Sequence, residues 1–152
     1  MSEKYRKILV PLDGSPLSEQ AIPHALRVAE KGHTQLILLR VVPHITEQLI
    51  TVDTLPLDWK NLDAEQERMA SEALAPLEAL APRLRREQVD VQTAIEVGHA
   101  ADRIVDYAEA HDIDLIVMST HGRTGVQRWL MGSVAGKVIG AAPCPILLVR
   151  AR

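Results

Sequence analysis

The sequence predicts an α/β domain in which helices cover both faces of an open, five-stranded parallel sheet, and it assigns residues 1–152 to one domain. Five short apolar runs recur along the chain, and amphipathic helical segments separate them. Strands that alternate with helices form parallel sheets with right-handed crossovers. Most of the runs are unbroken, which is typical of strands that are covered on both faces. A chain of 152 residues can bury such a core without disulfides or a structural metal.

The predicted first strand, residues 7–12, is apolar after its first residue and belongs in the middle of the sheet. Pro11 has no N–H for a neighbouring strand, so we expect it among the last residues of this strand. The turn at residues 13–16, Asp-Gly-Ser-Pro, then supplies an N-cap and an N1 proline for one helix that Gly32 closes. The apolar stripe of this helix consists of Ile22, Ala25, Leu26 and Ala29.

The second strand is predicted at residues 34–42, and an irregular segment of the lid or binding-loop kind is expected to follow as far as Asn61. A charged amphipathic helix is then predicted at residues 63–86. Because its apolar period continues across Pro76 and Pro82, we expect a kinked helix or two helices end to end. Its stripe consists of Met69, Ala73, Leu77, Leu80 and Leu84.

The third predicted strand, residues 89–97, alternates more than the others and is expected near an edge of the sheet. Gly98 and His99 lead into the next helix, whose inner face carries Ile104, Val105 and Ala108. A fourth strand follows at residues 113–118. The final helix begins at Gly132-Ser133 and ends at Gly140, before a fifth strand at residues 145–149.

Composition excludes several classes of function. A net charge of −3 argues against nucleic acid or an anionic membrane as the main partner, and the chain has no Phe, two Tyr and two Trp for stacking on bases. No apolar run approaches the roughly 20 residues of a membrane helix, and the first residues lack the apolar segment of a secretory signal, so a cytoplasmic location is expected. The single cysteine, Cys144, is interpreted as a small buried hydrophobe.

Ligands of an open parallel sheet bind beyond the carboxyl ends of its strands. Asp13, residues 41–44 and residues 119–125 all follow predicted strands, so we expect them to line one crevice. Asp112 and Asp114 precede the fourth strand and are therefore expected at the opposite end, as solvated cap residues.

The segment after the fourth strand has the pattern of an anion site. Gly122 and Gly125 lie in the predicted loop, and Gly132-Ser133 opens a helix. Glycine allows a ligand to approach the backbone, and a helix N-terminus presents unpaired N–H groups and about +0.5 of a charge, so the pattern favours a phosphate over glycines that only form turns. A side chain on Gly132 would take the phosphate position, so Gly132→Val is expected to abolish binding and leave the fold intact.

Three related motifs are absent. Gly132 and Gly136 enclose three residues where a P-loop has four, and Val138 stands where a P-loop has its magnesium-binding hydroxyl. The first turn does not read G-x-G-x-x-G, so it is not the dinucleotide fingerprint. Ser133 does not lie in the G-x-S-x-G elbow of a hydrolase nucleophile.

Four stretches carry a resemblance to a known family: I-L-V-P-L-D-G-S at the start, V-V-P after the second strand, S-T-H-G-R-T-G after the fourth and A-P-C-P-I-L-L-V-R at the end. Over essentially its whole length the chain resembles the universal stress proteins of the nucleotide-binding type. That family's ATP signature is glycine, two residues, glycine, nine residues, glycine, then Ser or Thr. Gly122, Gly132 and Ser133 match it, and Ser119 replaces its first glycine. The resemblance implies a Rossmann-like sheet with strand order 3-2-1-4-5.

The resemblance also implies a ligand, ATP, with any Mg or Mn held through its phosphates and with no metal-ligand or catalytic residues of the protein. Adenine would lie at the first group of residues, Pro11, Leu12, Asp13 and Val41. Ribose and phosphates would lie at the second group, Met118, Ser119, Thr120, His121, Gly122, Arg123, Gly125, Gly132, Ser133 and Val134. A homodimer through the fifth strand is implied as well, with neither nucleic acid nor membrane as partner.

Two site residues keep a second interpretation. Asp13 can form an Asx-turn and cap the first helix as well as contact adenine. His121 can act as a general base, or it can be a polar loop residue that stabilises a turn. The function expected is a nucleotide-dependent regulatory or stress-resistance module with little or no hydrolysis; the alternatives are a slow ATPase or phosphotransfer protein, and a protein without nucleotide that acts by protein contacts. The segment from Gly122 to Ser133 argues against the last.

Overall fold

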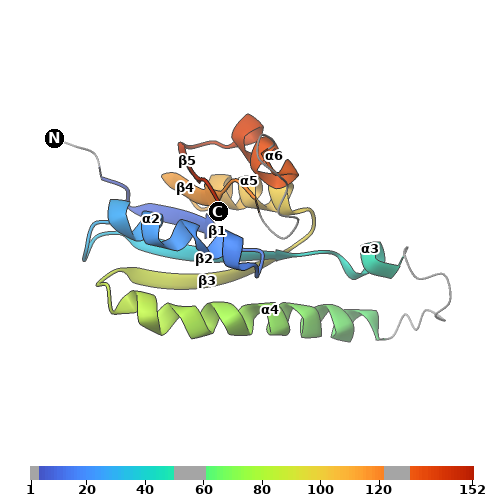
Figure 1. Cartoon of the computed structure of the whole chain (residues 1–152). Helices are drawn as coiled ribbons and strands as arrows, with labels where there is room; N and C mark the ends of the chain where they lie inside the picture. Colours follow the sequence, from blue (N-terminus) through green and yellow to red (C-terminus); the bar gives the residue numbers. More distant parts are fainter. Residues whose placement is uncertain (1–3, 50–60, 122–130) are drawn as a thin grey trace.

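The computed structural model describes residues 4–49, 61–121 and 131–152 (Figure 1). In chain order its elements are β1 (Lys7–Pro11), α1 (Pro16–Glu19), α2 (Ala21–Val28), β2 (Gln35–Val42), α3 (Ile45–Leu49), α4 (Leu62–Arg85), β3 (Asp90–Val97), α5 (Ala100–Ala110), β4 (Leu115–Ser119), α6 (Ser133–Ala141) and β5 (Ile146–Val149). The five strands pair in parallel in the order β3-β2-β1-β4-β5, which confirms the predicted fold class and strand order.

Two apolar clusters, one on each face of the sheet, form the core. On one face α2 and α4 pack against Ile8 and Val10 of β1, and on the other face α5 and α6 pack against Leu9. Figure 1 shows α4 on one side of the strands and α5 and α6 on the other. Because successive side chains of a strand point to opposite faces, a strand covered on both sides needs apolar residues at every position. The unbroken run in β1 therefore reflects its central place in the sheet.

The sheet opens between β1 and β4. From β1 the chain proceeds outward through β2 to β3, and from β4 it proceeds the other way to β5. The last pairing between β1 and β4 is Leu9 with Ile116, although the two strands continue to Pro11 and Ser119. Separation of the strand ends at the point where chain direction reverses creates a crevice at the carboxyl edge, where such sheets bind ligands.

The first helix differs from the prediction, because it consists of α1 and α2 with a turn at Gln20 between them. Ser15 is the N-cap of α1 and Pro16 is its first residue, as predicted. Pro23 explains the interruption. It has no N–H to donate to the Glu19 carbonyl four residues earlier, so the helix is broken where that bond would form.

The second prolines-containing helix, α4, is one uninterrupted helix of 24 residues, and the alternative of two separate helices is wrong. Pro76 and Pro82 are exposed, whereas Leu77 and Leu84 are buried. The proline rings therefore face solvent, where water can bond the carbonyls that the missing N–H groups leave without a partner. The continuous packed stripe holds the helix together across both prolines.

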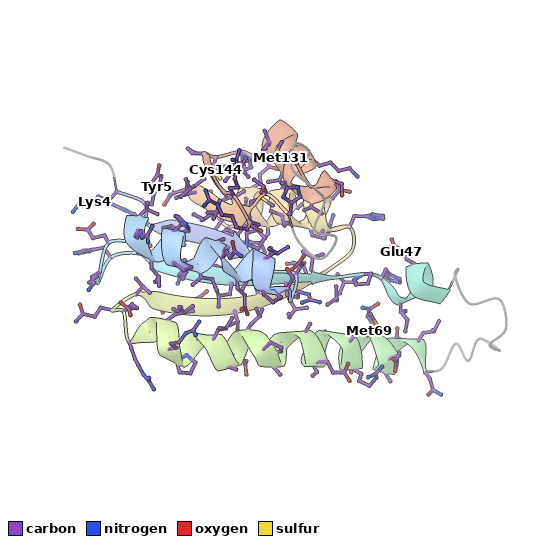
Figure 2. All side chains as sticks on the ribbon, in the orientation of Figure 1. Lys4, Tyr5, Glu47, Met69, Met131 and Cys144 are labelled. Carbon is purple, nitrogen blue, oxygen red and sulfur yellow. The ribbon has the colours of Figure 1, made fainter. Side chains whose placement is uncertain are left out.

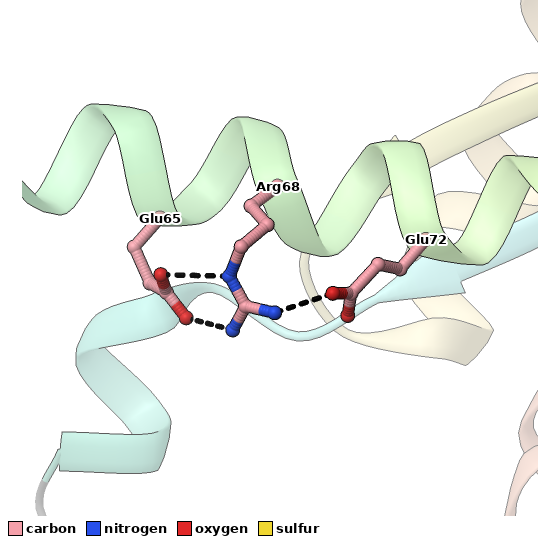
Figure 3. A network of polar contacts seen from close by, with 3 residues as sticks. All are labelled: Glu65, Arg68 and Glu72. Carbon is pink, nitrogen blue, oxygen red and sulfur yellow. Dashed lines mark hydrogen bonds and ion pairs between the residues drawn. The ribbon is translucent and has the colours of Figure 1, made fainter.

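Near the start of α4, Arg68 donates to Glu65 and Glu72 on the same exposed face (Figure 3). Its bonds with Glu65 lower the pKa of that carboxyl and raise the pKa of the guanidinium. Since all three groups are solvated, this network adds little to stability.

Part of the segment expected to be irregular is helical. α3 occupies Ile45–Leu49, directly after β2, and residues 50–60 lie outside the described residues. Gln66 of α4 fixes this segment, since its side chain accepts from the Ile45 N–H (2.8 Å) and donates to the Pro43 carbonyl (3.3 Å). In Figure 2, Glu47 marks α3 well beyond the end of the sheet that carries Lys4 and Tyr5.

The opposite edge of the sheet contains the two aspartates that precede β4. Both are exposed, and the Asp114 carboxylate accepts from the backbone N–H groups of Arg6 and Lys7, each at 2.9 Å. Asp114 therefore caps the start of β1, in agreement with its predicted structural role. Asp112 has a positive φ of 52° at the turn into β4.

Candidate nucleotide-binding site

A cavity of about 220 Å³ lies at the carboxyl ends of β1, β2 and β4, bordered by α5 and α6. The predicted site residues that line it are Pro11, Leu12, Asp13, Val41, Met118, Ser119, Thr120, His121, Gly132, Ser133 and Val134. Gly122, Arg123 and Gly125, which complete the predicted set, lie outside the described residues. The sheet thus brings together residues that are up to 123 positions apart, from Pro11 to Val134.

Sequence reasoning missed five residues of the cavity wall: Ser18, Leu39, Ala100, Ile104 and Ala135. Leu39, Ile104 and Ala135 also belong to the core cluster under α5 and α6, so their apolar character gave no sign of a second role. Ala100 could have been found, because it is the first helical residue after β3 and therefore lies at the carboxyl edge.

β2 reaches further into the crevice than β1. The last pairing of the two strands is Pro11 with Leu39, and the Leu12 N–H still donates to the Leu39 carbonyl at 2.8 Å. β2 then continues to Val42. Since successive residues of a strand direct their backbone groups to opposite sides, the N–H and C=O of Val41 point to the same side as the Leu39 carbonyl. Val41 therefore presents one donor and one acceptor where β1 has ended.

Asp13 is held by a compact network with two serines. Its Oδ1 accepts from the N–H of Ser15 (2.9 Å) and from the Ser15 hydroxyl (2.5 Å). The same hydroxyl oxygen accepts from the Ser18 N–H (3.1 Å), while the Ser18 hydroxyl donates to the Ser15 carbonyl (2.9 Å). The first of these bonds forms the predicted Asx-turn. The network fixes the Asp13 carboxylate at the cavity wall and caps α1 at the same time.

The end of β4 is tied to both elements that follow it. Ser119 is buried, and its hydroxyl donates to the His121 carbonyl at 2.6 Å, which tightens the turn out of the strand. The Thr120 N–H donates to the Val149 carbonyl of β5 (2.9 Å), and the Thr120 carbonyl accepts from the Gly132 N–H (2.8 Å). Thr120 thus connects β5, the cavity and the start of α6.

The N-terminus of α6 borders the cavity. Gly132 is its N-cap and has no side-chain cap, and the first bond within the helix runs from the Gly136 N–H to the Gly132 carbonyl (3.0 Å). The N–H groups of Ser133, Val134 and Ala135 therefore precede any acceptor within α6. Together with the positive end of the helix dipole they favour an anion at this end of the cavity.

His121 lies at the cavity wall, where its Nδ1 is 3.1 Å from the Thr120 hydroxyl oxygen. In the part of the chain that the structure describes, no three His, Cys, Asp or Glu side chains gather where they could hold a metal ion. Among the described cavity residues, Asp13 is the one carboxylate, and neither lysine nor arginine takes part. Across residues 4–49, 61–121 and 131–152, no helix combines the length and hydrophobicity that crossing a bilayer requires.

Comparison with known proteins identifies the family. The model of the universal stress protein family matches residues 4–150. This chain belongs to the universal stress protein family. A universal stress protein of Methanothermobacter thermautotrophicus is 35% identical over 150 residues, which cover 99% of each chain.

Solved universal stress protein structures share the fold. The structure of MJ0577 from Methanocaldococcus jannaschii aligns with a TM-score of 0.84 and 27% identity over 99% of both chains. The universal stress protein of Archaeoglobus fulgidus, solved in complex with dAMP, aligns with a TM-score of 0.63 and 20% identity, over 97% of this chain and all of that one. At that identity the second likeness concerns the fold.

Two parts of the universal stress protein signature can be located in this member. Ser119, at the position of the first glycine, directs its side chain into a backbone bond of the turn rather than leaving the strand end bare. Gly132 and Ser133 form the N-terminus of α6, as the match predicts. Gly122, the signature glycine between them, lies outside the described residues.

Proposed function

We propose that this universal stress protein binds ATP in the cavity and works as a nucleotide-dependent regulatory or stress-resistance module with little or no hydrolysis. The observation that carries the proposal is the N-terminus of α6, where three N–H groups without intrahelical acceptors border an apolar slot. We expect micromolar affinity, a binding free energy of about −8 kcal/mol.

Adenine suits the β2 side of the cavity. Its Watson–Crick edge carries one N–H donor beside one acceptor, the complement of the C=O and N–H of Val41. Leu39, Met118 and Ile104 provide an apolar surface for a flat ring. Asp13, which the Ser15 network holds in place, adds an acceptor on the β1 side.

The phosphates suit the α6 side, where the Ser133 hydroxyl and the backbone amides can donate to them. With Asp13 as the one carboxylate among the described cavity residues, the protein supplies no carboxylate pair for magnesium. Any Mg or Mn would therefore be held mainly through the phosphates. Efficient phosphoryl transfer usually needs a metal held by the protein and a positioned nucleophile, so binding without rapid turnover is the expected behaviour.

The fifth strand supports a proposed homodimer. β5 lies at an edge of the sheet, and its Ile146, Leu147 and Leu148 side chains are only half-buried. Edge strands of this kind pair readily with another chain, and a two-fold axis would place two β5 strands antiparallel.

The proposed nucleotide site is tested by Ser133→Glu, with Ser133→Gln as the uncharged control of similar size. Ser133 is exposed at the first position of α6, where a carboxylate stabilises the helix dipole but repels phosphates. We expect calorimetry to show at least a tenfold loss of ATP affinity, about 1.4 kcal/mol, in Ser133→Glu only, with an unchanged or higher melting temperature. Equal ATP affinity in both variants would refute the assignment of phosphates to α6.

A further inference from the structure

We propose that the first turn of α5 forms the wall of the base-binding end of the cavity, and that Ala100 limits the size of the group that can enter there. The inference rests on the proposed nucleotide site and assigns a residue that the family signature does not contain. Ala100 lines the cavity together with Ile104, four residues later on the same face of α5.

The start of α5 is fixed against the end of β2. The Gly98 N–H donates to the Val42 carbonyl at 2.9 Å, one residue beyond Val41. Gly98 has a φ of +140°, a conformation that residues with a side chain rarely adopt. The chain therefore leaves β3 in a sharp, glycine-dependent turn, and α5 begins next to the Val41 backbone groups that are proposed to contact adenine.

The remainder of α5 cannot move away from the cavity without loss of core packing. Ile104 and Ala108 are 3% and 1% exposed and belong to the same cluster as Leu39 and Met118. The Arg103 N–H bonds to the His99 carbonyl at 2.9 Å, which fixes the first turn of the helix. Ala100, which is only half-buried, is thus the point where a rigid wall meets the open end of the cavity.

A larger side chain at this position would occupy space that the base needs. Ala100→Leu adds three carbon atoms to a wall that is fixed by packing, and added volume in a confined apolar site is costly. Leucine is also a strong helix former, so the helix should tolerate the change. The penalty should therefore fall on the ligand, and it should fall on the base because Val41 lies at the same end.

The matched control is Ala110→Leu, the same substitution at the exposed end of the same helix. Calorimetry with ATP and with adenosine separates base from phosphate contacts. We expect Ala100→Leu to weaken both ligands by a similar factor, at least tenfold, and Ala100→Val to weaken both by a smaller factor. Ala110→Leu should change neither, and melting temperatures should show that the variants are folded.

The outcomes distinguish this inference from the proposed function. ATP and adenosine binding that is unchanged in both Ala100 variants would overturn the inference and leave the nucleotide site standing. Loss of ATP with full retention of adenosine would overturn it too, since the wall would then face the phosphates. Absence of ATP binding by the unchanged protein would overturn the proposed function and the inference together. If Ala100→Leu does not fold, Ala100→Val decides between the same outcomes.

Discussion

The Thr120 carbonyl oxygen lies 2.9 Å from the position that a Cβ on Gly132 would occupy, and it accepts the Gly132 N–H at 2.8 Å. Glycine at this position therefore has a structural reason that does not involve a ligand. Any side chain on Gly132 would push against the backbone at the end of β4.

Gly132→Ala is accordingly expected to lower the free energy of unfolding by about 1–3 kcal/mol. The sequence-based expectation that Gly132→Val would leave the fold intact misses this cost. Gly136→Ala is the control, because a Cβ there meets no atom within 4 Å and removal of a helical glycine stabilises by about 0.5–1 kcal/mol. Urea unfolding of both variants measures the contrast, and equal stability of the two would contradict the prediction.

Ser15→Ala should destabilise the protein by about 1 kcal/mol, because it removes the N-cap of α1. It should also weaken ATP binding, since the hydroxyl no longer holds Asp13. Ser15→Thr keeps a hydroxyl and should recover most of both effects. Ser71→Ala, at an exposed position inside α4, is the control and should not reduce stability. Thermal unfolding and calorimetry together test this, and full ATP affinity in Ser15→Ala would argue that Asp13 needs no positioning.

His121→Ala is expected to change ATP affinity more than the rate of hydrolysis. With stoichiometric protein, ATP should remain largely intact over about an hour, as followed by chromatography of the nucleotide. If His121 were a general base, phosphate release would rise with pH through the imidazole range near about 6.5 and would disappear in the variant. Rapid release of that kind would make the protein an ATPase.

The proposed dimer can be tested at Leu148. The carbonyls of Pro145 and Val149 accept from β4, so by alternation the backbone groups of Leu148 point away from the sheet, toward the open edge. Leu148→Pro removes an N–H from that edge, while Leu148→Ala shortens the side chain and keeps the N–H. Light scattering should give about twice 16.8 kDa for the unchanged protein and the alanine variant, and the monomer mass for the proline variant. A monomer mass for the unchanged protein at high concentration would disprove the dimer.

Cys144, which Figure 2 shows on the α6 and β5 side of the molecule, provides a test of pH dependence. Burial and, to a lesser extent, the charge of Asp114 raise the pKa of its thiol above the ordinary value. The neutral thiol is thus favoured in the folded state, so its contribution to stability is present at neutral pH and is lost as pH rises through the raised pKa. We expect alkylation by iodoacetamide at about pH 8.5 to be slower than for glutathione, and to approach that rate after unfolding.

The sequence by itself determined the sheet. Unbroken apolar runs placed all five strands, and the largest difference in a strand boundary is two residues, at the start of β4, residue 115 against 113. It also determined the local chemistry of the Ser15 cap and the N-terminus of α6 at Ser133. These features depend on residues that are close in sequence, so local patterns of hydrophobicity and capping are sufficient to predict them.

Only the tertiary structure decided features that depend on distant packing. α4 continues through Pro76 and Pro82 because its buried stripe lies on the sheet, whereas local rules predict a kink or a break. The contact of Gly132 with Thr120 and the place of Ala100 in the cavity wall arise from elements that meet only when the sheet has formed. A sequence pattern specifies which face of an element is apolar, but the neighbours of each side chain are set when those faces are packed together.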